Sequence, residues 1–172
     1  MVTAQNIYEV PLLLEGAGVA EYLMKRLGLK ARRKPDWSEW RTLVNTLHRE
    51  RPTVKVALVG KYTELQDAYM SVREALRHAT IAEGVELDLR FIPSVDLEKG
   101  QGWDELREVA GIVVPGGFGS RGIEGKLQAI RYARQKRIPC LGLCLGMQLM
   151  VIDFAREMLG NPRHCDTSHK LL

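Results

Sequence analysis

The chain has little of what marks a membrane or secreted protein. Its 172 residues contain no apolar run near the length of about 18 residues that a membrane-spanning helix needs. Residues 1–6 hold no basic group ahead of an apolar segment, which argues against a secretory signal. The three cysteines, Cys140, Cys144 and Cys165, are an odd number and argue against a disulfide framework. We therefore expect reduced thiols and a cytoplasmic protein.

Excess charge of one sign is also scarce, except in one stretch. The net charge is +4, but between Lys25 and Lys55 ten lysines and arginines stand against three acids, which gives +7 there and −3 elsewhere. Such a stretch could meet nucleic acid or a phosphate-rich ligand. A solvated connector is the commoner outcome for a charge run. We expect a basic linker and helix over residues 30–52, and neither a nucleic-acid nor a membrane partner.

Repeats and low-complexity segments are absent, and hydrophobic spacing divides the chain into a helical part and an α/β part. Apolar residues from Leu12 to Leu27 recur at helical spacing up to Gly28, and a second helix is predicted from Asp36 to Leu47. The predicted strands are 54–59, 85–92, 111–115 and 138–143, and the later helices are 67–82, 103–109, 122–137 and 145–159. This alternation implies a parallel sheet with helices on both faces, whose chemistry lies in the loops after the strands.

The loop after the first predicted strand begins like a phosphate-binding P-loop at Gly60-Lys61. The motif is not completed, because Lys55 stands where a P-loop needs glycine and Tyr62 where it needs serine or threonine. We exclude nucleoside triphosphate hydrolysis at this loop. Two interpretations of Lys61 stay equally open: an exposed lysine at the end of a strand, or a residue of a ligand pocket.

A glycine-rich loop follows the third predicted strand. Residues 117–122 fit the G-x-G-x-x-G pattern of dinucleotide-binding proteins. That function also needs a carboxylate about 20 residues later, and the next predicted strand ends in residues 141–144 without one. Dinucleotide binding is therefore a minor alternative. Consecutive glycines from Gly116 suit a loop whose N–H groups converge on an anion, or else a flexible turn.

The strongest chemical signal is the segment 142–146, Gly-Leu-Cys-Leu-Gly. It has the form of a nucleophile elbow, a sharp strand-to-helix turn in which glycines relieve the crowding around an exposed nucleophile. A helix N-terminus favours the thiolate of Cys144, and the N–H of Leu145 points to where an oxyanion would form. We predict that Cys144 is a nucleophile rather than a buried structural cysteine, and that Cys140 belongs to the core.

Together these motifs resemble class I glutamine amidotransferases. The resemblance rests on residues 115–119 (Pro-Gly-Gly-Phe-Gly) and 142–148 (Gly-Leu-Cys-Leu-Gly-Met-Gln), and segments 7–12, 61–69 and 117–122 extend it to the CTP synthase family. It implies an α/β, flavodoxin-like parallel sheet, incomplete here, with a helical N-terminal appendage. Residues 1–29 would be the end of a synthetase domain, and residues 53–172 would be the N-terminal part of the amidotransferase domain. Residues 30–52 would form the basic linker and helix between them.

The resemblance also implies a reaction and its participants. Members of this family are ligases of pyrimidine biosynthesis that make CTP from UTP, ATP and glutamine-derived ammonia. They use Mg²⁺, take GTP as activator and assemble as homotetramers, whereas this chain itself is expected to hold no cofactor. By match to the family motifs, Cys144 takes the glutamine amide as a thioester. The other matched residues are Gly117 and Leu145 for the oxyanion hole, Gly146, Met147 and Gln148 for the glutamine pocket, and Lys61, Tyr62 and Arg121 for possible lid or activator loops.

The sequence departs from the family pattern after Cys144. The family base is a His with a Glu two residues on, and neither His164 nor His169 begins such a pair. We therefore expect a fragment that is inactive alone, and a non-catalytic scaffold or interaction module stays open as the alternative. A fragment would also leave apolar residues of its last helix without partners, which we expect to be Leu149, Ile152 and Leu159.

Overall fold

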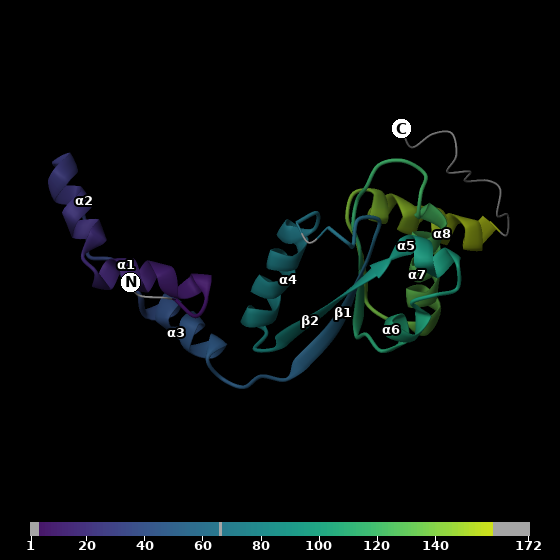
Figure 1. Ribbon diagram of the computed structural model, residues 1–172, viewed down its shortest axis with the longest axis horizontal. Coiled ribbons are helices and arrows are strands. Elements are labelled where there is room, and N and C mark those ends of the chain that lie inside the picture. The colour runs from purple at the N-terminus through teal and green to yellow at the C-terminus, as the bar shows by residue number, and fades with distance from the viewer. Residues whose placement is uncertain (1–3, 66, 160–172) are drawn as a thin grey trace. The chain divides into compact units, whose positions relative to one another are not determined.

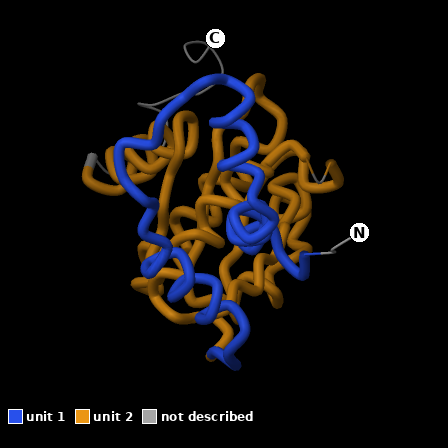
Figure 2. Tube along the Cα trace, turned by 90° about the vertical axis from the view of Figure 1, so that its left-hand side faces the viewer, with its two compact units in different colours: residues 1–51 blue, residues 52–172 orange. Residues whose placement is uncertain are grey.

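The chain forms two compact units in the computed structural model, which describes residues 4–65 and 67–159. Residues 1–51 make the first unit and residues 52–172 the second (Figure 2). Within the described residues, no helix is both long and apolar enough to cross a membrane.

The first unit is built from short helices. They are η1 (Ile7–Glu9), α1 (Val10–Gly16), α2 (Val19–Leu27) and α3 (Ser38–Leu47). The single helix predicted over residues 12–27 is wrong, because Gly18 adopts a left-handed φ of 72° and separates α1 from α2. Gly28 ends α2 with a φ of 65°, as predicted.

Two aromatic residues hold the first unit together. The Trp40 indole Nε1 donates a hydrogen bond of 2.7 Å to the carbonyl oxygen of Tyr8, and the two rings pack 6.5 Å apart. His48 approaches Glu9 at 3.0 Å. Three large apolar side chains of α2 are exposed, Tyr22, Leu23 and Leu27, and so are the basic side chains from Lys25 to Lys34.

The second unit is a parallel α/β sheet (Figure 1). Its strands are β1 (Thr53–Gly60), β2 (Glu86–Pro93), β3 (Gly111–Val114) and β4 (Cys140–Gly142), in the order β2-β1-β3-β4 with every pairing parallel. The helices are α4 (Met70–Ala82), α5 (Ser94–Glu98), α6 (Trp103–Arg107), α7 (Ile123–Lys136) and α8 (Leu145–Leu159). The predicted parallel sheet is confirmed, and its strand order is that of a flavodoxin-like fold.

Two predicted elements begin or end at other residues than expected, and one helix of the structure was not predicted. The helix predicted from residue 67 begins at Met70, because the Tyr69 side chain turns into the sheet edge, where its hydroxyl accepts hydrogen bonds from the Lys61 and Tyr62 N–H groups. The strand predicted over 138–143 is only the three residues of β4. The short helix α5 was not predicted.

The core lies between the sheet and the helices α5 to α8. Ala57 and Val59 from β1, Ile112 and Val114 from β3 and Leu149 from α8 all belong to it. Figure 1 shows α4 on the other side of the strands. Helices therefore cover both faces, as the buried strands require.

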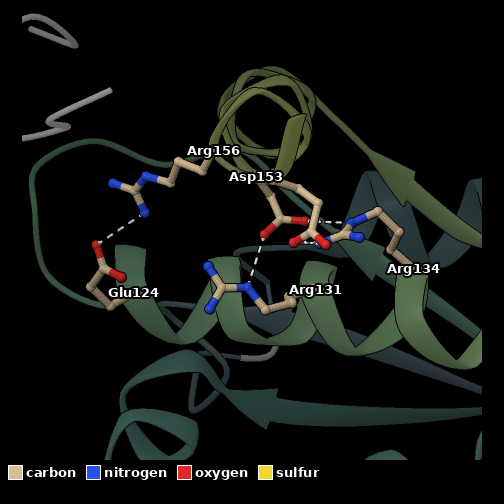
Figure 3. A network of polar contacts seen from close by, with 6 residues as sticks. Glu124, Arg131, Arg134, Asp153 and Arg156 are labelled. Atoms are coloured by element: carbon tan, nitrogen blue, oxygen red, sulfur yellow. Dashed lines mark hydrogen bonds and ion pairs between the residues drawn. The ribbon is translucent and has the colours of Figure 1, made fainter. Parts of the chain in front are cut away.

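A polar network joins α7 to α8 (Figure 3). The carboxylate of Asp153 on α8 is 1% exposed and accepts hydrogen bonds from Arg131 Nε at 3.1 Å and Arg134 Nε at 2.9 Å. Arg134 also reaches Glu157, and Arg156 lies 3.9 Å from Glu124. The network fixes how α8, which begins directly after Cys144, packs on α7.

One face of α8 carries apolar side chains that are exposed, but not the predicted ones. Leu149 is fully buried and Ile152 packs against the core, so the expectation that they lack partners is wrong. The side chain of Leu159 lies outside the described residues. The exposed apolar residues of α8 recur at helical spacing: Met147, Val151, Phe154 and Met158.

Candidate active site

Cys144 lies in the sharp turn between β4 and α8. Its φ is 52°, in the left-handed region that residues other than glycine rarely adopt. Its side chain is exposed. A left-handed residue between a strand and a helix is the geometry that a nucleophile elbow requires, and it places the thiol beside the first N–H groups of α8.

The glycines on either side of Cys144 are required by close packing. A Cβ atom at Gly142 would lie 2.5 Å from the backbone nitrogen of Met147, at the start of α8. A Cβ atom at Gly146 would overlap the carbonyl oxygen of Val114 at the end of β3. Larger residues at either position would push α8 away from the sheet and displace the turn.

The glycine-rich loop after β3 lies directly against Cys144. The register Val114↔Gly142 brings the ends of β3 and β4 together, and the Leu143 N–H donates to the Val114 carbonyl at 2.9 Å. A Cβ atom at Gly116 would lie 3.3 Å from the Cys144 Cβ and 3.7 Å from its Sγ. The two predicted chemical loops therefore meet at one point of the sheet edge.

Lys126 is a residue of this region that sequence reasoning missed. It lies on α7, is 2% exposed, and its Nζ donates to the carbonyl oxygens of Pro115 at 2.9 Å and Gly116 at 3.1 Å. The pKa of Lys126 is lowered to about 8, chiefly by burial and in part by nearby Lys61, while the charge of Cys144 opposes this shift. No motif marked it, since a lysine in an amphipathic helix is usually solvated.

A surface cavity of about 370 Å³ lies at the same sheet edge, and its lining includes Lys61, Tyr62 and Arg121. The Lys61 Nζ lies 5.3 Å from the centre of the Tyr62 ring and donates to the Phe118 carbonyl at 2.7 Å, so it connects this cavity to the glycine-rich loop. The loops after β1 and β3 flank the point where the strand order reverses, which is where open α/β sheets bind ligands.

The other predicted site residues differ in exposure. Leu145 and Gly146 are buried, whereas Met147 and Gln148 face solvent on the first turn of α8. Cys140 is half-buried in β4, and burial raises the pKa of its thiol to about 11, so it is a poor nucleophile at neutral pH. Cys165, His164 and His169 lie outside the described residues.

Comparison with known proteins decides the family. Residues 64–170 match the family model described as glutamine amidotransferase class-I. The chain belongs to the class I glutamine amidotransferase family. The resemblance inferred from the glycine and cysteine motifs is thereby confirmed.

Relatives of this amidotransferase are named CTP synthase. One from Cyanothece is 57% identical over 155 residues, which is 90% of this chain and 28% of the relative's length. One from Methanopyrus kandleri is 47% identical over 90% of this chain and 29% of its own length. The chain thus spans less than a third of these curated relatives.

A solved structure supports the same fold. It is titled Trypanosoma brucei CTPS, glutaminase domain with bound acivicin, and it is 39% identical, with a TM-score of 0.57. The match covers 67% of this chain and 48% of that domain. The amidotransferase assignment therefore rests on sequence and on backbone geometry together.

Proposed function

We propose that this amidotransferase chain carries the glutaminase nucleophile of a CTP synthase. Cys144 attacks the amide carbon of glutamine, so that a C–S bond forms and the C–N bond breaks. The proton lost by the thiol passes to the leaving nitrogen, which departs as ammonia. Water then hydrolyses the thioester to glutamate and restores the thiol. In the whole enzyme, the ammonia aminates UTP in a step that consumes ATP.

The observation that carries this proposal is the left-handed turn that exposes Cys144 against the glycine-rich loop. The N–H groups of Gly117 and Leu145 stabilise the oxyanion that forms on the amide carbonyl oxygen. Gly146, Met147 and Gln148, on the first turn of α8, form part of the glutamine pocket. Acivicin in the Trypanosoma brucei domain supports a ligand site in this fold.

We assign the cavity at Lys61, Tyr62 and Arg121 to the activator, GTP. Lys61 and Arg121 supply two cations for its phosphates, in a lining that also includes the acids Glu64 and Asp96. The contact of Lys61 with the Phe118 carbonyl would transmit the presence of the ligand to the glycine-rich loop. Among residues 4–65 and 67–159 no group of three or more His, Cys, Asp or Glu side chains could hold a metal ion. We assign Mg²⁺, ATP, the tetramer and the cytoplasmic location to the whole enzyme.

The nucleophile assignment is tested by competition among the three thiols. Limiting iodoacetamide at pH 7 should label Cys144 first, because Cys144 is exposed at a helix N-terminus while burial raises the pKa of Cys140. Mass spectrometry of the digested chain would map the adducts, with Cys144→Ala as the control. Faster labelling of Cys140 or Cys165 would contradict the assignment.

Glutamine hydrolysis by these 172 residues alone should be slow. General-base help contributes about 10²–10⁴-fold, and no His-x-Glu pair follows Cys144 in this sequence. Ammonia release should therefore barely exceed that of Cys144→Ala. Steady release that Cys144→Ala abolishes would mean that His164 or His169 serves as the base.

A further inference from the structure

Lys126 differs from Lys136, the other lysine of α7, because its side chain is buried. The side chain is 2% exposed, and the Nζ is held under the glycine-rich loop by the carbonyl oxygens of Pro115 and Gly116. Lys136, at the end of the same helix, is exposed. Burying an ammonium group is costly, so its two hydrogen bonds to the loop must compensate for lost hydration.

The contact with Gly116 fixes the direction of a neighbouring N–H. The Gly116 carbonyl and the Gly117 N–H belong to one peptide unit, and in a trans peptide these two bonds point in opposite directions. Because the Gly116 oxygen points at the Lys126 Nζ, the Gly117 N–H points away from α7. Gly116 also lies against the Cys144 side chain, in the direction in which a Cβ atom at Gly116 would project.

The glycines leave this loop free to rotate unless something holds it. Gly116 and Gly117 are adjacent, and Gly119 adopts a φ of 75°, so the segment has little intrinsic conformational preference. A rotated Gly116–Gly117 peptide would present its carbonyl oxygen to the developing oxyanion and repel it. An ammonium group that binds both carbonyls selects the orientation that presents the N–H.

We propose that Lys126 is a positioning residue for the oxyanion hole: its ammonium group binds the Pro115 and Gly116 carbonyls and thereby directs the Gly117 N–H toward the carbonyl oxygen of a substrate at Cys144. This inference rests on the proposed function, because it takes Cys144 as the nucleophile and Gly117 as an oxyanion donor. Lys126 itself does not touch the reacting atoms.

Two reactions of the same thiol separate this role from a structural one. Alkylation of Cys144 by iodoacetamide displaces iodide and forms no oxyanion. Acylation by p-nitrophenyl acetate does form one: the thiolate attacks the ester carbon, a C–S bond forms, and p-nitrophenolate leaves with the electron pair of the broken C–O bond. The ratio of the acylation rate to the alkylation rate therefore reports the oxyanion hole, and a general loss of thiol reactivity cancels from it.

The variants are Lys126→Met, which keeps the length of the side chain but removes the donor, and Lys126→Arg, which keeps a cationic donor. Lys136→Met makes the same change at the exposed lysine of α7. Removing an oxyanion donor costs about 10²–10³-fold, so a donor that is present but misdirected should lower the ratio about tenfold or more in Lys126→Met. Lys126→Arg should recover part of the ratio, and Lys136→Met should match the parent chain.

Rates are taken on the full 172-residue chain, with acetylation of Cys144 confirmed by mass spectrometry and the Cys144→Ala background subtracted. An unchanged ratio in Lys126→Met, or no recovery in Lys126→Arg, would overturn the role of Lys126 while the nucleophile assignment stands. A parent chain in which Cys144 is not acetylated would instead refute the proposed function. If Lys126→Met does not fold, Lys126→Gln, which can donate to only part of this arrangement, should show a smaller loss in the same ratio.

Discussion

Asp153 should be the polar residue whose loss most destabilises the second unit. Its carboxylate is 1% exposed and accepts from Arg131 and Arg134, which join α8 to α7 (Figure 3). Hydrogen bonds to charged groups contribute about 1.5–3 kcal/mol each, but burying the carboxylate offsets part of that gain. The two arginine side chains are 46% and 31% exposed, so they recover hydration when the carboxylate is removed. We therefore expect Asp153→Ala to lower the free energy of unfolding by about 2–3 kcal/mol.

Urea unfolding followed by circular dichroism measures this loss. Asp104→Ala is the matched control, since Asp104 also pairs with an arginine, Arg107, at 2.9 Å, but its side chain is 97% exposed. Exposed pairs contribute about 0–1 kcal/mol, so this control should shift the midpoint little. Two protein concentrations are needed, because association would make the midpoint depend on concentration. Equal losses in the two variants would refute the argument that burial makes the Asp153 network important.

Further expectations follow from the exposed apolar side chains of α8 and from the shifted pKa values of Lys126 and Cys140. The chain should self-associate through α8, and Phe154→Lys should weaken that association in sedimentation velocity; a parent chain that stays monomeric at every concentration would contradict this. Between pH 8 and 9 the free energy of unfolding should rise, because the unfolded state binds more protons than the folded state, in which burial lowers the pKa of Lys126 to about 8. Above pH 9 Cys140 opposes this rise, since burial raises its pKa to about 11 and the folded state then keeps the proton longer. Lys126→Met should remove the rise between pH 8 and 9 in the same urea titrations.

The elements that sequence patterns predicted are those in which one local signal decides the conformation. The strand at residues 54–59 is apolar except for Lys55, and it forms β1, whose last four residues are buried. The G-x-C-x-G segment predicted a tight turn, and the structure places Cys144 in one with a left-handed backbone. In each case the residue types allow few alternatives.

The features that could not be predicted depend on contacts between distant segments. Tyr69 reads as the apolar first turn of a helix, yet its hydroxyl accepts hydrogen bonds from the loop after β1, and α4 begins one residue later. Lys126 reads as a solvated helix residue, and only the position of the glycine-rich loop explains its burial. On α8 periodicity alone did not indicate which of two apolar faces meets the sheet, and Leu149 proved to be on the inner one.

The left-handed backbone of Cys144 has a consequence for engineering this domain. A residue with a side chain in that conformation costs roughly 1 kcal/mol or more, and glycine would remove the cost. A selection for thermostability alone would therefore favour Cys144→Gly, which yields a better-folded protein with no thiol. Mutant libraries that are screened for stability should keep Cys144 unchanged, because glycine at this position gives the more stable protein and only cysteine gives the reactive one.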